Sequence, residues 1–165
     1  MTGQRPGMRG TNGGDLVVPL IVVGVAVYLL LRFCYDSIPE LQYVVALPLG
    51  VLAIIELVLA RRVRGAVRHE PHARPMTAIA IARCVALGKA TALVGAGVVG
   101  AALGVLGRTL PDASSVTAAA HDTRVAAVLA AVAAILCAAG VLLERAGMDP
   151  GGRDDPPRAG ERRSS

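Results

Sequence analysis

The sequence predicts an all-α integral membrane protein, a four-helix bundle whose N- and C-termini both lie in the cytoplasm. Its apolar composition, its four long apolar runs and the placement of its arginines lead to this prediction. Of the 165 residues, 54% are hydrophobic, and the mean hydropathy of +0.58 is high for a soluble domain. Because this apolar surface exceeds what the core of a small domain can hold, we expect the excess to face lipid.

Four apolar runs are long enough to cross a bilayer, whose hydrocarbon core of about 30 Å takes about 20 helical residues. We predict helices because only helices and closed barrels satisfy their backbone in lipid, and the alternation of barrel strands is absent. The arm of residues 1–15 precedes the spans, and the polar, Pro- and Gly-rich residues 144–165 predict a disordered cytoplasmic tail. The expected transmembrane domain, 16–143, has spans at 16–33, 43–60, 86–106 and 123–143.

The arginines give the predicted bundle its direction, because cytoplasmic loops of membrane proteins are enriched in Lys and Arg. The connection between the second and third runs carries five arginines against one acid, Glu70. We therefore place this connection and both termini in the cytoplasm. Sixteen of the seventeen basic residues are Arg, which indicates a GC-rich, bacterial genome, so we expect a multi-pass protein of the bacterial plasma (inner) membrane. The five arginines, which are also candidate contacts for lipid headgroups, are Arg61, Arg62, Arg64, Arg68 and Arg74.

Two ionisable residues fall inside the expected spans. Glu56 lies five residues before Arg61, and Lys89 lies at a similar depth in the third span, each about 7 Å from the cytoplasmic end of its helix. Because such a residue is costly in lipid unless it is paired, hydrated or near the surface, we expect a Glu56–Lys89 charge pair. The pair could fix the packing of spans two and three or serve as an ion relay. Lys89 shares its helix face with Gly100 and Gly104, so this face predicts a close helix contact.

Other polar motifs have simpler interpretations than a catalytic or metal site. The segment from His69 to His72 has ligand-like spacing, but Pro71 interrupts the helix that this spacing needs, so we expect a solvated loop. Asp122 is placed to cap the last span, and Arg124 to contact headgroups. We expect no cofactor, no metal and no nucleic-acid partner, because the basic residues flank apolar runs and are not interleaved with aromatic residues.

Several short segments together resemble a known family. They are Arg32 through Leu41, Ala73-Arg-Pro75, Ala82 through Ala90, Asp122-Thr-Arg124 and the acidic Asp154-Asp-Pro-Pro157. They are similar to an actinobacterial membrane-protein family, domain-of-unknown-function family 3180, over about residues 16–143. The resemblance implies four spans and a bacterial inner membrane, and it supplies no catalytic residue. It also implies that Arg83, Lys89, Asp122 and Arg124 are the first residues to mutate.

Three classes of function remain open from the sequence. The leading hypothesis is a non-enzymatic accessory or scaffold component of the bacterial envelope, with membrane lipid and another membrane protein or a second copy as partners. The first alternative is a small oligomeric transporter that uses Glu56 and Lys89. The second is an enzyme that acts on lipid at the outer face, although its candidate residues are too scattered to predict a catalytic site. They are Asp36, Glu40, His121 and Asp122.

Overall fold

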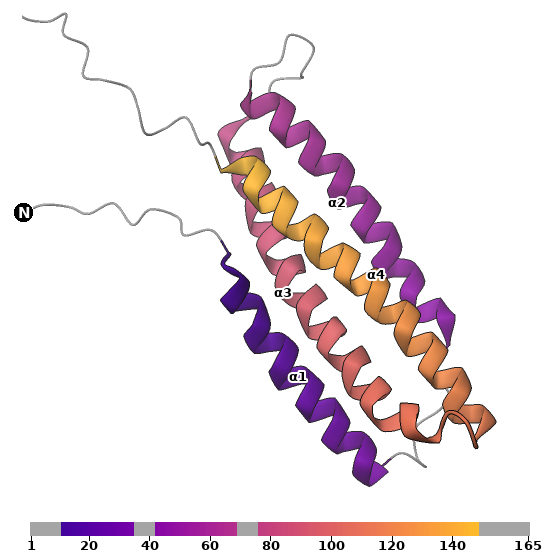
Figure 1. The fold of residues 1–165 in the computed structure, drawn as a ribbon. Helices are drawn as coiled ribbons and strands as arrows, with labels where there is room; N and C mark the ends of the chain where they lie inside the picture. Colours follow the sequence, from indigo (N-terminus) through magenta and orange to yellow (C-terminus); the bar gives the residue numbers. More distant parts are fainter. Residues whose placement is uncertain (1–10, 35–41, 69–75, 149–165) are drawn as a thin grey trace, which may run out of the picture.

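The computed structural model describes residues 11–34, 42–68 and 76–148, and these residues form four long helices (Figure 1). The short 3₁₀ turns η2 (Tyr43–Val45) and η3 (Leu110–Asp112) precede α2 and follow α3. All four helices are long and apolar enough to cross a membrane. The predicted all-α, four-helix membrane protein is therefore confirmed. The helices are α1 (Gly13–Cys34), α2 (Ala46–Val67), α3 (Ala78–Thr109) and α4 (Thr117–Gly147).

The helices pack side by side in the order α1, α3, α4, α2 (Figure 1). The largest contacts join α3 to α4, α1 to α3 and α2 to α4, while α2 approaches α3 at a few positions. Within the described ranges, α1 packs against neither α2 nor α4. The four helices therefore form an open row. In this row α3 lies between α1 and α4, and α4 lies between α3 and α2.

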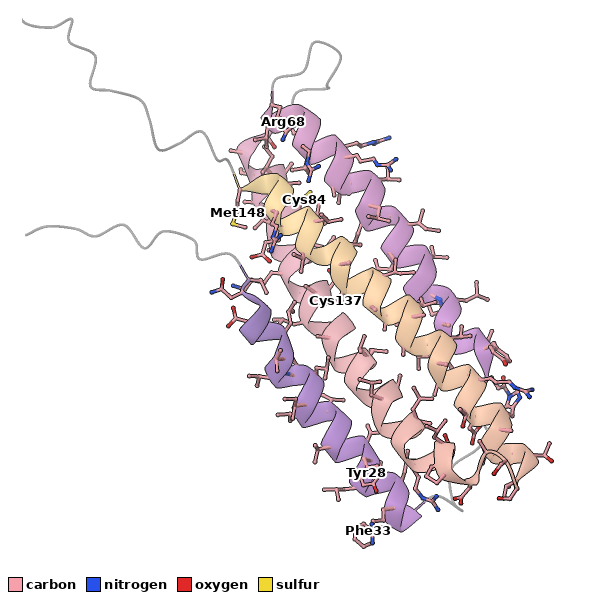
Figure 2. All side chains as sticks on the ribbon, viewed as in Figure 1. Tyr28, Phe33, Arg68, Cys84, Cys137 and Met148 are labelled. Atoms are coloured by element: carbon pink, nitrogen blue, oxygen red, sulfur yellow. The ribbon has the colours of Figure 1, made fainter. Side chains whose placement is uncertain are left out.

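Both described ends of the chain lie at one end of this row. α1 and α3 run in one direction, and α2 and α4 run in the other (Figure 1). Arg68 and Met148 consequently lie together, far from Phe33 (Figure 2). We call the end that carries Arg68 and Met148 the arginine end, because six exposed arginines lie there. They are Arg61, Arg62, Arg64, Arg68, Arg83 and Arg145, against Arg32, Arg108 and Arg124 at the opposite end.

Glycines on α3 allow close approach of both of its main neighbours. A Cβ atom added at Gly88 would lie 2.6 Å from the carbonyl oxygen of Gly140 on α4. One added at Gly104 would lie 2.6 Å from the carbonyl oxygen of Gly24 on α1, and Gly100 packs against Leu20 of the same helix. The absence of side chains lets these backbones touch. The expected helix contact at the Gly100 and Gly104 face is confirmed, and its partner is α1.

The ends of α4 differ from the expected span. The helix begins at Thr117 after Val116, which gives no side-chain cap, so Asp122 lies inside the helix and the predicted cap is wrong. The preceding Ala118, Ala119 and Ala120 are strong helix formers, and they extend the helix beyond its apolar run. At the other end α4 continues to Gly147, so the first residues of the expected tail are helical. Residues 149–165 lie outside the described residues.

Candidate functional site

The buried polar residues of the described chain lie at three levels. Thr11 and Glu144 lie at the arginine end, Glu56 and Thr91 lie near the middle of α2 and α3, and Thr109 and Asp122 lie toward the opposite end. In α3, 18 positions separate Thr91 from Thr109, which corresponds to about 27 Å of helix. The buried α3 residues between Thr91 and Thr109 are Ala, Gly and Val.

Glu56 occupies the meeting point of three helices. Its side chain is fully buried, with 0% exposed, where α2 packs against α4. Thr91 of α3 lies next to the carboxyl group, and a Cβ atom added at Gly140 of α4 would lie 2.9 Å from Thr91 Oγ1. Neither Glu56 oxygen has a hydrogen-bond partner among the described residues. We call Glu56, Thr91 and Gly140 the Glu56 junction.

The structure does not bring Glu56 and Lys89 together. Lys89 is exposed, whereas Glu56 is buried against the face of α3 that carries Thr91. Two positions along a helix correspond to a rotation of about 200°, so Lys89 and Thr91 lie on nearly opposite faces. The expected charge pair is therefore not formed. The long Lys89 side chain is instead free to extend toward the headgroup layer at the arginine end.

A second buried carboxylate, Glu144, was missed by the sequence reasoning. Only 2% of its surface is exposed, and its Oε1 accepts a hydrogen bond of 2.7 Å from the main-chain N–H of Thr11. Its Oε2 and the Thr11 hydroxyl have no partner among the described residues. The indication in the sequence was Gly140, because Glu144 follows it by one helical turn and so lies on the same face of α4. The expected span ended at Leu143 and so excluded it.

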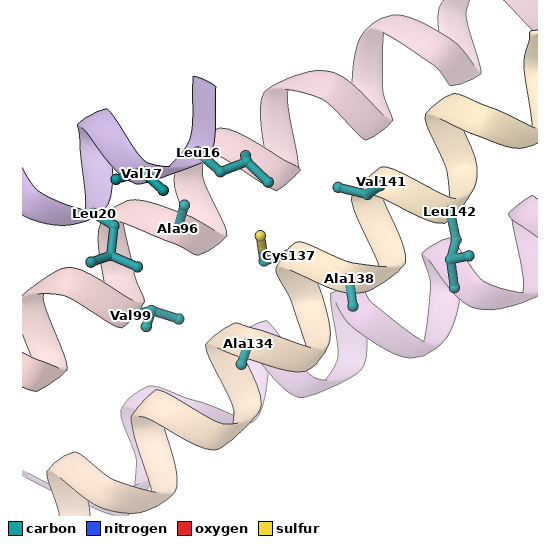
Figure 3. Close-up of a pocket in the computed structure, with 10 residues that line it drawn as sticks. All are labelled: Leu16, Val17, Leu20, Ala96, Val99, Ala134, Cys137, Ala138, Val141 and Leu142. Carbon is teal, nitrogen blue, oxygen red and sulfur yellow. The ribbon is translucent and has the colours of Figure 1, made fainter. Parts of the chain in front are cut away.

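An apolar groove runs between α1 and α4 over α3, with a volume of about 520 Å³ (Figure 3). It exists because α1 and α4 flank α3 without packing against each other. The Cys137 sulfur projects into it (Figure 3). We call this the α1–α4 groove. Its lining residues are Leu16, Val17 and Leu20 of α1, Ala96 and Val99 of α3, and Ala134, Cys137, Ala138, Val141 and Leu142 of α4.

Comparison with known proteins identifies the family. The model of a family described as a protein of unknown function, DUF3180, matches residues 16–150, which cover most of the chain. The chain belongs to the DUF3180 family. No curated protein matches it, and no solved structure matches it. The family resemblance seen in the sequence is thereby confirmed.

The residues that carried the DUF3180 resemblance do not form one site. Arg83 is exposed in the second turn of α3, at the arginine end. Asp122 and Arg124 lie near the start of α4, at the opposite end, where Asp122 is 6% exposed and Arg124 is exposed. Of the headgroup candidates, the described ones are exposed at the arginine end, and Arg74 lies outside the described residues.

The candidate residues for an outer-face enzyme are only partly described in this DUF3180 protein. The His121 ring packs edge-on against Tyr43, with 5.6 Å between ring centroids. Asp36, Glu40, His69 and His72 lie outside the described residues. Nearby, Arg108 forms a half-buried ion pair of 2.7 Å with Asp112. Within the described ranges, no three His, Cys, Asp or Glu residues are grouped so as to hold a metal ion.

Proposed function

We propose that this DUF3180 protein is a non-enzymatic accessory component of a bacterial plasma membrane that binds a helix of another membrane protein in the α1–α4 groove. The groove itself carries the proposal. Its volume of about 520 Å³ falls in the range of about 300–1,000 Å³ typical of binding pockets. The α4 wall and the α3 floor include Ala96, Ala134 and Ala138. Such small residues favour a helix over a lipid chain, because they let a helix backbone approach.

The proposed orientation places the arginine end in the cytoplasm. It is supported by six exposed arginines at that end against three arginines at the other among the described residues. Arginine and lysine are enriched on the cytoplasmic side of membrane proteins. Both termini would then be cytoplasmic, and the η3 turn would face outside. In this orientation the exposed Arg61, Arg62 and Arg64 would contact anionic headgroups.

Site-specific photo-crosslinking in native membranes tests the groove. A photoreactive amino acid at Val141, which lines the groove, should capture one integral membrane protein at near-stoichiometric yield. The same amino acid at Ile135, exposed on α4 outside the groove, is the matched control and should capture much less. Filling the groove by Ala138→Trp should abolish capture at Val141. Equal capture at both positions, or crosslinks to lipid alone, would contradict the proposal.

Glu56 favours the alternative function of a transporter, because it is an ionisable residue buried within a span. The position of Glu56 at the middle of α2 agrees with the polar groups that transporters commonly place near the bilayer midplane. Against a transporter, Lys89 does not line a path with Glu56, and about 27 Å of helix separates Thr91 from Thr109, the next buried polar residue of α3. Proton flux into proteoliposomes should equal that of protein-free vesicles for the wild type and for Glu56→Gln. A flux that the wild type supports and Glu56→Gln lacks would replace the accessory proposal with the transporter.

A further inference from the structure

Glu56 is a buried acidic group that no basic group of the described residues reaches. Arg61 and Arg62 on its own helix and Lys89 on α3 are exposed. The buried ionisable residue that α4 contributes at the arginine end is Glu144, which is also acidic. α1 does not pack against α2 within the described ranges. An ionised carboxylate taken out of water without a counter-charge or hydrogen bonds is strongly disfavoured, and the usual outcome is neutralisation.

Thr91 shows which protonation state of Glu56 fits the junction. The Thr91 hydroxyl donates to the carbonyl oxygen of Leu87 at 2.9 Å, with a longer contact of 3.2 Å to that of Gly88. A threonine hydroxyl has one proton, so this oxygen has only lone pairs left for the neighbouring Glu56. An ionised carboxylate also has only lone pairs, and the two groups would repel. A carboxylic acid has an O–H that can donate to Thr91 Oγ1.

We propose that the Glu56 junction is a proton-binding site, in which Glu56 is held as the neutral carboxylic acid and directs its O–H toward Thr91 Oγ1. The bound proton removes the charge that would otherwise oppose the packing of α2 on α3 and α4. Glu56 therefore stabilises the junction as a hydrogen-bond donor and not as half of an ion pair. This inference is independent of what occupies the α1–α4 groove.

Infrared spectroscopy of the full-length protein in lipid nanodiscs at neutral pH tests the site, because a protonated carboxyl group has a C=O stretching band that ionised carboxylates lack. We expect the wild type to show this band and Glu56→Gln to lose a component of it. Lys89→Gln should keep the whole band. Asp112→Asn, which changes a half-buried acid paired with Arg108, is the matched control and should also keep it. If Glu56→Gln instead loses intensity from the band of ionised carboxylates and keeps the whole protonated band, the proposal is overturned.

Thr91→Val separates the hydrogen bond from general packing, because valine has nearly the shape of threonine but no acceptor oxygen. The Glu56 component should remain in this variant and move to higher frequency, as expected for a C=O group whose acid proton has lost its acceptor. This measurement does not depend on whether Glu56→Gln folds. A wild-type spectrum without a protonated band at neutral pH would overturn the proposal, as would a Thr91→Val spectrum identical to the wild type.

Discussion

The main-chain N–H of Thr11 donates to Oε1 of Glu144 across 2.7 Å and joins residues 133 positions apart. Both residues are buried, at 7% and 2% exposure. The bond connects Thr11, two residues before α1, to the end of α4, and these two helices do not pack against each other within the described ranges. It therefore links one outer helix of the row to an inner one at the arginine end. A hydrogen bond to an ionised carboxylate is stronger than a neutral one.

Glu144→Ala should free the Thr11 amide. A hydrogen bond to a charged group contributes about 1.5–3 kcal/mol, so hydrogen exchange at Thr11 should accelerate roughly tenfold or more. Glu144→Gln keeps an acceptor oxygen in nearly the same place and should exchange much more slowly than Glu144→Ala. Hydrogen-exchange mass spectrometry of the peptide that contains Thr11 measures both. Unchanged exchange in Glu144→Ala would show that the bond does not hold this segment.

The contact between α3 and α4 should be highly sensitive to a methyl group at Gly88. The added Cβ atom would meet the Gly140 carbonyl oxygen at 2.6 Å and the Glu144 main-chain nitrogen at 2.8 Å, and neither backbone atom can move alone. Overpacking of this kind costs about 1–3 kcal/mol, so Gly88→Ala should lower the free energy of unfolding in mixed micelles by that amount.

Gly50→Ala is the control for Gly88→Ala, because its Cβ atom would meet Val132 at an ordinary 3.8 Å. Alanine has a higher helix propensity than glycine by about 1 kcal/mol, so this variant should be as stable as the wild type or more stable. Circular dichroism during denaturation with sodium dodecyl sulfate measures both variants. Equal effects of Gly88→Ala and Gly50→Ala would mean that α3 and α4 do not cross at Gly88.

The contact between α1 and α3 should respond to Gly104 and not to Gly107. A Cβ atom at Gly104 would lie 2.6 Å from the Gly24 carbonyl oxygen, whereas one at Gly107 would lie 3.6 Å from the Tyr28 ring. Gly104→Ala should therefore destabilise the protein and Gly107→Ala should not. Gly24→Ala and Gly104→Ala act on one crossing, so their effects on the unfolding free energy should be non-additive, whereas Gly104→Ala and Gly88→Ala should be nearly additive. Additivity within the first pair would argue against the crossing.

The sequence predicted the number and class of the helices because span length and apolar content depend only on the chain and the bilayer. It did not predict the open row. Each span is apolar around most of its surface, so no amphipathic stripe identifies its neighbours. The glycines carried the available information, and the Gly100 and Gly104 face was correctly predicted as a helix contact. The sequence did not indicate that α1 was its partner.

The candidate site shows the same limit at the level of single residues. Position along the sequence gives depth only where the helix ends are known. Because α2 continues to Val67 and α3 begins at Ala78, Glu56 and Lys89 each lie eleven residues from the helix end, which is deeper than expected. Their rotation about the helix axes depends on which helices touch. The predicted charge pair of Glu56 and Lys89 does not form, because Glu56 of α2 meets α3 at Thr91, about 200° around the helix from Lys89. Glu144 was missed for a different reason, since α4 extends past its apolar run to Gly147.

The proposed orientation predicts which surface positions an impermeant reagent can reach in intact cells. Ser114→Cys places a thiol in the exposed connection between η3 and α4, and Arg68→Cys places one just after α2 at the arginine end. Because six exposed arginines favour the cytoplasm at that end, a membrane-impermeant maleimide should label Ser114→Cys directly. It should label Arg68→Cys only after permeabilisation.

Both variants are made in a background that lacks the native cysteines, Cys34, Cys84 and Cys137. Cys84 is buried against Leu143 and Ala146, so alanine is the substitution that disturbs its packing least. Labelling of Arg68→Cys in intact cells, with Ser114→Cys protected, would invert the proposed topology. The α1–α4 groove and the Glu56 junction would remain, but the Thr11–Glu144 bond at the end of α4 would then lie toward the outer surface.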